Sequence, residues 1–180
     1  MLLSYHDCEI KYGSHYQIKK ALESEQLYKI EPGIYADTPN VSELEIVSFK
    51  YTQAVFTMDS AFYYHGLTDV IPERYHLATS KDAHKIGGKR IKQYFHRDDT
   101  FPIGMTTMQY RGTIIRIYDR ERMLIELIRN KKALPFDYYK EIIESYRRAV
   151  QTMDIEKLQE YILAFPKQNH IWEAVELEVM

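Results

Sequence analysis

The sequence predicts an α+β protein, because three different patterns follow one another along the chain. Residues 4–36 have the pattern of two short helices and a hairpin. Residues 54–118 hold short segments with strand-like alternation, and residues 119–178 hold apolar residues at helical spacing. We therefore expect two domains, residues 1–38 and residues 39–180. The second domain should be mixed α/β with a helical C-terminal tail.

The first pattern begins with two helices separated by a glycine. Ser4 can cap a helix that Gly13 ends, and Ser14 can cap the next helix. The second helix has apolar residues three and four positions apart, at Ile18, Ala21 and Leu22. Since the first helix begins almost at Met1, we expect the helix that usually precedes such a pair to be missing or reduced to a few residues.

A hairpin is expected after these helices. Residues 27–30 and 34–36 have strand-like patterns, and Pro32-Gly33 suits a tight turn between them. Helix, glycine turn, helix and hairpin is the order of a winged helix-turn-helix. We therefore interpret residues 1–38 as a DNA-binding winged helix-turn-helix with a curtailed start.

In such a motif the start of the second helix enters the major groove, and the hairpin is the wing. A Gln side chain can pair with adenine, and Tyr or Ser can donate to phosphate. The expected DNA-binding residues of the first domain are Ser14, His15, Tyr16, Gln17, Lys19, Lys20, Lys29 and Gly33. A homodimer would place two such helices on an inverted repeat in operator DNA.

The basic residues are concentrated in the middle of the chain. The formal net charge of −2 excludes a globally basic nucleic-acid binder, but residues 81–97 hold six basic residues against one acidic residue. Such a local field can attract a polyanion. The Gly87-Gly88 pair does not match a phosphate-binding loop motif, so it is either a solvated turn or a flexible backbone contact. The DNA-backbone contacts expected here are Lys85, Lys89, Arg90, Lys92 and Arg97.

Cysteine usage and hydropathy indicate a cytoplasmic protein. Cys8 is the only cysteine, which excludes an intrachain disulfide and a cysteine-based zinc site. No run of about eighteen apolar residues is present, so no membrane span is expected. The first ten residues lack the basic start and long apolar core of a secretory signal.

The stretch "DSAFYYHGLTD", residues 59–69, brings Ser, His and Asp close together in sequence. A hydrolytic triad gathers its residues from distant parts of a fold, and no nucleophile-elbow motif surrounds Ser60. A structural explanation is simpler. Asp59 or Ser60 caps a helix, His65 lies in its last turn and Gly66 ends it.

Other candidate chemistry is weaker. The histidines His65, His76, His84 and His96 lack the spacing of a metal site. The pair Asp98-Asp99 has no third carboxylate at a useful spacing for metal-assisted phosphate chemistry. We therefore expect no metal, no cofactor and no enzymatic activity.

Several pieces of the chain together resemble the AbiEi-type antitoxins of abortive-infection, or type IV, toxin–antitoxin systems. These pieces are "KKALESEQLYKIEPGIYAD", "DSAFYYHGLTD", "IPERYHLATS" and "IYDRERMLIELIR", in that order. The resemblance implies a winged helix-turn-helix that represses its own operon, with the reading helix at 14–24 and the wing at Tyr28–Tyr35. It also implies a C-terminal domain that counters a nucleotidyltransferase-like toxin, with basic residues in 81–97 and 111–122.

Three hypotheses follow for the function. The first is an antitoxin that also binds operator DNA and regulates its own expression. The second is an antitoxin or docking protein that acts through protein contacts only, with a degenerate winged helix. The third is a small nucleic-acid enzyme that uses Asp98 or Asp99, which the spacing supports least.

Overall fold

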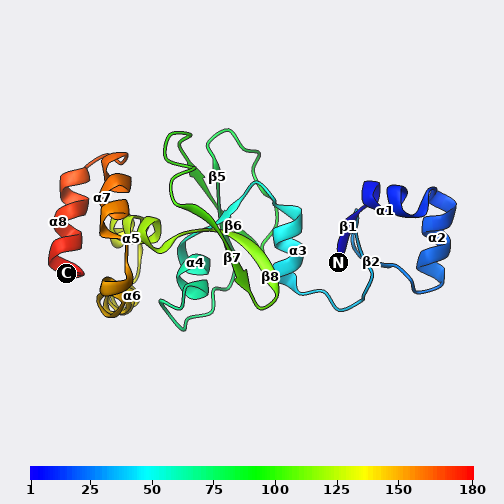
Figure 1. Ribbon diagram of the computed structural model, residues 1–180, viewed down its shortest axis with the longest axis horizontal. Helices are drawn as coiled ribbons and strands as arrows, with labels where there is room; N and C mark the ends of the chain where they lie inside the picture. The colour runs from blue at the N-terminus through cyan, green and yellow to red at the C-terminus, as the bar shows by residue number, and fades with distance from the viewer. The chain divides into compact units, whose positions relative to one another are not determined.

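The computed structural model describes residues 1–180 and has the expected α+β class, with eight α-helices and two β-sheets (Figure 1). The chain forms two compact units, Met1–Thr52 and Gln53–Met180. The domain boundary expected after residue 38 falls inside the first unit, because the helix that follows it packs on the sheet of that unit. No helix is both long enough and apolar enough to cross a lipid bilayer.

The first unit consists of a three-stranded antiparallel sheet and three helices. The sheet order is β1-β3-β2. The elements are β1 (Leu2–Ser4), α1 (Tyr5–Tyr12), α2 (His15–Glu23), β2 (Tyr28–Glu31), β3 (Ile34–Ala36) and α3 (Glu43–Lys50). Strand β1 lies where no strand was expected, and it pairs with β3 along its whole length.

Local capping explains the helix pair. The Ser4 hydroxyl accepts from the backbone N–H of Asp7, and the Asp7 carboxylate accepts from that of Ser4, which is a capping box. Gly13 ends α1 with a φ of 85°, a left-handed conformation that suits glycine. The Ser14 hydroxyl then accepts from the Gln17 N–H and starts α2. These caps confirm the predicted helix starts.

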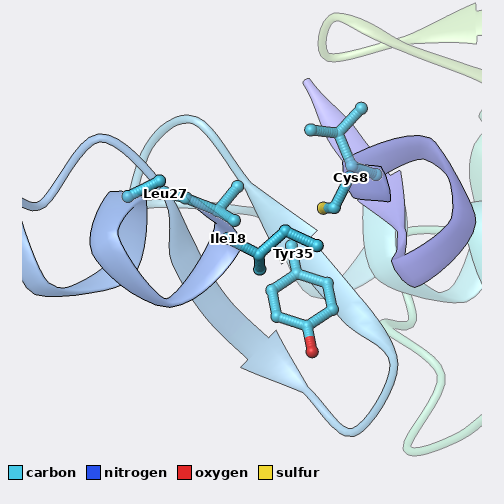
Figure 2. Close-up of a cluster of buried hydrophobic side chains, with 6 residues drawn as sticks. Cys8, Ile18, Leu27 and Tyr35 are labelled. Atoms are coloured by element: carbon cyan, nitrogen blue, oxygen red, sulfur yellow. The ribbon is translucent and has the colours of Figure 1, made fainter. Parts of the chain in front are cut away.

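The sheet of the first unit is covered on both faces, since adjacent strand residues point to opposite sides. One face packs on α1 and α2 through a buried cluster: Leu3, Cys8, Ile18, Ala21, Leu27 and Tyr35 (Figure 2). The other face, with Leu2, Ile34 and Ala36, packs against Ile46 of α3. Helix α3 therefore completes a three-layered unit.

The second unit is built on a mixed five-stranded sheet of order β6-β5-β4-β8-β7. Pairs β4–β8 and β5–β6 are parallel, and pairs β4–β5 and β7–β8 are antiparallel. The strands are β4 (Val55–Phe56), β5 (Tyr75–Ser80), β6 (Ile91–His96), β7 (Met105–Tyr110) and β8 (Thr113–Tyr118). The turn between β7 and β8 consists of Arg111 and Gly112, which both have positive φ, at 46° and 86°. This is the geometry of a tight hairpin turn that matches strand twist.

Five helices accompany this sheet: α4 (Met58–Tyr64), α5 (Arg120–Arg129), α6 (Phe136–Ala149), α7 (Ile155–Leu163) and α8 (Gln168–Glu178). Helix α5 packs against α4, α7 and α8 (Figure 1). Its residues from Glu121 to Ile128 are all buried. A helix that is buried on every side is the centre of a core rather than a surface layer.

The start of α4 differs from the prediction. The N-cap residue is Thr57, and it makes no side-chain cap hydrogen bond. Asp59 and Ser60 lie inside the helix, and the buried Ser60 hydroxyl accepts from the backbone N–H of His76. The serine satisfies a polar group of the neighbouring strand β5, which local sequence spacing does not reveal.

Arg122 of α5 is fully buried and surrounded by partners. Its guanidinium lies between the rings of Tyr118 and Phe165, with its central carbon 4.4 Å and 4.6 Å from the two ring centres. Nε donates to the Glu126 carboxylate at 3.0 Å, and Nη2 lies 3.1 Å from Nδ1 of His96. A buried cation needs such a complete set of partners, because desolvation of an unpaired charge costs several kcal/mol.

The same guanidinium holds the loop between β6 and β7. Its Nη1 donates to the backbone carbonyls of Thr100 and Ile103. Gly104 passes close to the arginine stem, with a φ of 77°, and a Cβ atom at this position would lie 2.4 Å from Cβ of Arg122. Only glycine fits there, for both steric and conformational reasons.

We predict that Gly104→Ala destabilises the protein by at least about 3 kcal/mol, since it adds core overpacking to left-handed strain. Gly112→Ala is the matched control, because Gly112 has φ 86° and open space around the Cβ position. It should cost only about 1 kcal/mol. Urea unfolding followed by circular dichroism gives both values. Equal losses in the two variants would contradict the steric account.

Candidate nucleic-acid interface

The solvent-facing side of α2 carries the residues expected to read DNA. Tyr16 is 72% exposed, and Gln17, Lys19 and Lys20 are also exposed. Ile18 and Ala21 of the same helix are buried in the cluster of Figure 2. The helix is thus anchored on one side and leaves side chains with hydrogen-bonding groups and positive charge on the other.

Some of these residues already have partners within the unit. Ser14 caps α2 through its hydroxyl. His15 Nδ1 lies 3.2 Å from the Tyr5 hydroxyl, so its ring is oriented by α1. Lys19 and Glu23 are 3.9 Å apart, and both side chains are well exposed. An exposed ion pair of this kind is weak and can exchange for a phosphate contact.

The β2–β3 hairpin presents the remaining candidates of the first unit. Lys29 is exposed on β2. Gly33 lies in the turn with a φ of 79°, where a side chain would be strained. The hairpin is short, so a wing formed by it can contact DNA through only a few residues.

The basic segment of the second unit is an ordered loop followed by the edge strand β6. Gln93 of β6 holds the loop, since its Oε1 accepts from the Ile86 N–H at 2.7 Å. Its Nε2 donates to the Thr79 hydroxyl at 2.8 Å and to the His84 carbonyl at 3.1 Å. These hydrogen bonds of Gln93 were not predicted from the sequence, because a single Gln in a strand has no distinctive local pattern.

The five candidate cations of this segment are all exposed: Lys85, Lys89, Arg90, Lys92 and Arg97. Arg97 forms an exposed ion pair with Asp99 at 2.6 Å. Lys81 pairs with Asp98 at 3.3 Å. The aspartates of the Asp98-Asp99 pair thus neutralise neighbouring cations. No group of three or more His, Cys, Asp or Glu side chains is placed to hold a metal ion.

The two basic surfaces belong to different compact units. The surface on α2 and the hairpin lies in Met1–Thr52, and the loop with β6 lies in Gln53–Met180. Each surface is therefore a separate candidate for contact with a nucleic acid.

Side chains and backbone groups of residues 59–69 make structural contacts with other elements of the unit. His65 Nε2 lies 2.7 Å from the carbonyl oxygen of Tyr118, and Arg120 donates to the carbonyl oxygen of His65 at 3.0 Å. Ser60 instead bonds to the backbone of β5. The His-Gly-Leu and Asp-Arg-Glu-Arg pieces of the sequence therefore contact each other, and Ser60 is not bonded to His65.

A polar cluster that sequence reasoning missed joins α4, α6 and two strands. His76 Nε2 lies 3.5 Å from the Asp59 carboxylate, and the Tyr94 hydroxyl lies 3.0 Å from His76 Nδ1. The Tyr138 hydroxyl donates to Asp59 at 3.3 Å. Burial is the main cause that lowers the pKa of His76 to about 4; the nearby Lys92 and Arg74 act in the same direction, and Asp59 opposes them. His76 is therefore neutral at pH 7.

We predict that Gln93→Ala loosens the basic loop without unfolding the sheet. Amide hydrogen exchange of residues 84–90 should become faster by an order of magnitude or more, because three hydrogen bonds are lost. Gln109→Ala on the other edge strand is the control and should leave this loop unchanged. Unchanged exchange in Gln93→Ala would show that the loop is held by other contacts.

We predict that the protein loses stability as the pH falls from 6.5 towards 4. The unfolded chain binds a proton at His76 near its ordinary pKa of 6.5, whereas the folded protein binds it only near pH 4. The loss should be on the order of 2 kcal/mol from this residue. Burial also lowers the pKa of His65 and His96, so their protonation adds to the loss.

The measurement is the free energy of unfolding at several pH values. His76→Gln should show a smaller decrease between pH 7 and pH 4.5 than the parent protein. His6→Gln, at an exposed position, should keep the full decrease. A parental pH profile in His76→Gln would rule out this histidine as a source of acid sensitivity.

Comparison with known proteins adds no assignment to these surfaces. No family model matches the chain, and no curated protein sequence matches it. The function is therefore inferred from the residues and contacts of the two basic surfaces.

Proposed function

We propose that the chain is a DNA-binding antitoxin of the AbiEi type, which represses its own operon and counteracts a nucleotidyltransferase-like toxin. The observation that carries this proposal is the order of elements in the first 36 residues. Helices α1 and α2 are joined by Gly13-Ser14 and followed by the β2–β3 hairpin, on a sheet of order β1-β3-β2. This order supports a winged helix-turn-helix, whose second helix reads the major groove.

The chemistry of α2 fits such a role. Gln17 can make paired hydrogen bonds to adenine, and Tyr16 can donate to a phosphate. Lys20 is exposed and has no ion-pair partner, so it is available to a phosphate group. The anchored apolar face keeps these side chains in a fixed register relative to one another.

A third helix supports the sheet on which α2 packs. Helix α3 covers the sheet face opposite α1 and α2, where Ile46 contacts Leu2, Ile34 and Ala36. The small unit can thus bury both faces of its sheet, and this supports a stable platform for α2.

The basic loop of the second unit supports additional, sequence-independent contacts. Lys85 and Lys89 lie in an exposed loop that Gln93 holds in place. Phosphate contacts of this type raise affinity for all sequences and weaken with salt. In the proposed mechanism a homodimer reads an inverted repeat with α2, and the loop adds backbone contacts.

The test is fluorescence anisotropy with the full chain and labelled DNA from upstream of its own gene, against scrambled DNA of equal composition. Gln17→Ala should reduce the preference for the native sequence by about 1–3 kcal/mol. Lys85→Ala with Lys89→Ala should weaken binding to both duplexes alike and reduce its salt dependence. Lys140→Ala, an exposed cation on α6, serves as the control. Equal affinity for both duplexes in the parent protein would refute the operator-binding role.

An interaction-only antitoxin is a second candidate, and the charge of the first unit favours it. Residues 1–52 hold five basic and eight acidic side chains, which opposes attraction to DNA. Co-expression with a nucleotidyltransferase-like toxin separates the two candidates. Rescue of growth by a chain without selective DNA binding would place this second candidate first. Loss of rescue in Gln17→Ala would instead link antitoxin activity to DNA.

A further inference from the structure

A basic pocket lies in the second unit, away from both surfaces described above. It has a volume of about 440 Å³ and lies between the C-terminal end of α5, the short 3₁₀ turn Lys131–Ala133 and one face of α8. The residues from α8 and the segment before it recur at helical spacing, so this face of the helix forms one wall. The size falls within the range of small-ligand sites, about 300–1,000 Å³.

The pocket is strongly cationic although the chain carries a formal charge of −2. Four basic side chains line it, together with one histidine: Arg129, Lys131, Lys132, Lys167 and His170. The one carboxylate in the lining, Glu178, already accepts from Lys131 and from the Tyr139 hydroxyl, both at 2.8 Å. Lys132 and Lys167 have no ion-pair partner, so an anion entering the pocket meets uncompensated positive charge.

Arg129 is held in place before any ligand arrives. Its guanidinium lies over the Phe165 ring, with its central carbon 4.9 Å from the ring centre. Nη1 lies 3.4 Å from the buried Glu126 carboxylate. A guanidinium fixed on one face loses little side-chain entropy when it binds a planar or tetrahedral anion.

Lys167 occupies a backbone conformation that disfavours lysine. Its φ of 62° and ψ of 36° place it in the left-handed region, at the N-cap of α8. Glycine would be less strained there, by about 1 kcal/mol. The first turn of α8 contains no acidic residue and receives no side-chain cap, so its positive end also favours an anion. The backbone strain at Lys167, a residue that lines the pocket, supports a functional role for its side chain.

The remaining lining is apolar. Ile128, Ile171 and Ala174 contribute to the walls between the charged groups. A simple inorganic anion would leave these surfaces without a contact, whereas an organic phosphate can cover them with its carbon skeleton. The lining thus matches a ligand with one strongly anionic end and one apolar end.

We propose that this pocket binds a small organic phosphate, such as a nucleoside phosphate. The phosphate lies among Lys132, Lys167 and Arg129, and the organic part lies against Ile128 and Ile171. The small volume favours a single small molecule over an extended nucleic-acid strand. This inference does not depend on operator binding, because it uses none of the residues assigned to DNA.

The experiment is titration of the full ¹⁵N-labelled chain with adenosine monophosphate, with adenosine and inorganic phosphate as comparison probes. Adenosine monophosphate should give saturable shifts at residues 128–132 and 166–174, with affinity above that of either comparison probe. Lys167→Gly is the decisive variant, since it removes a cation and also relieves backbone strain. It should keep or raise the melting temperature and weaken binding by about tenfold.

A second pocket variant, one control variant and one competing ligand complete the test. Lys132→Ala should weaken binding in the same way as Lys167→Gly, whereas Lys140→Ala on α6 should bind like the parent. Unchanged affinity in both pocket variants would overturn the proposal, as would the absence of saturable shifts with adenosine monophosphate. Single-stranded oligonucleotides that bind these residues more tightly with each added nucleotide would also overturn it, in favour of a nucleic-acid groove.

Discussion

The second unit depends on the burial of one charged side chain. Arg122 lies at the centre of the unit, between two aromatic rings and within hydrogen-bonding distance of Glu126 and His96. Its remaining donors bind backbone carbonyls of the loop before β7, so the cation joins helix, sheet and loop through one planar group. Because an unpaired buried charge is very unfavourable, all of these elements must reach their positions together. This makes the arginine a determinant of the specific packing as well as of stability.

This arrangement explains why the His-Gly-Leu and Asp-Arg-Glu-Arg segments have a structural role. The Asp-Arg-Glu-Arg segment supplies a helix cap at Asp119, a bond to the His65 carbonyl, an ion pair from Glu121 to Lys157 and the buried Arg122. The His-Gly-Leu segment contacts the same region through His65. The surfaces that carry the proposed functions, α2 and the loop before β6, lie elsewhere on the chain.

Local sequence rules predicted the elements better than the contacts between them. Ser4 and Ser14 cap helices at the expected positions, because a capping bond involves neighbours three residues apart. Strand β1 was missed, since three residues beside a helix cap carry too little pattern. The partners of Gln93 and His76 come from other elements or from a loop without periodicity, so spacing alone could not reveal them. The exposed face of α2 was predictable from the helical spacing of its apolar residues, whereas the pocket beside α8 combines two segments that are distant in sequence, residues 128–132 and 166–178.

The Arg111-Gly112 turn between β7 and β8 has a consequence for the order of folding. Its left-handed geometry favours the observed register of six residue pairs, and this hairpin joins strands that are adjacent in sequence. Such a hairpin closes a short loop and can form within microseconds, whereas β4 must find β8 across more than fifty intervening residues. We therefore expect the five-stranded sheet to grow from its β7–β8 edge, with β4, β5 and β6 added as slower, long-range steps.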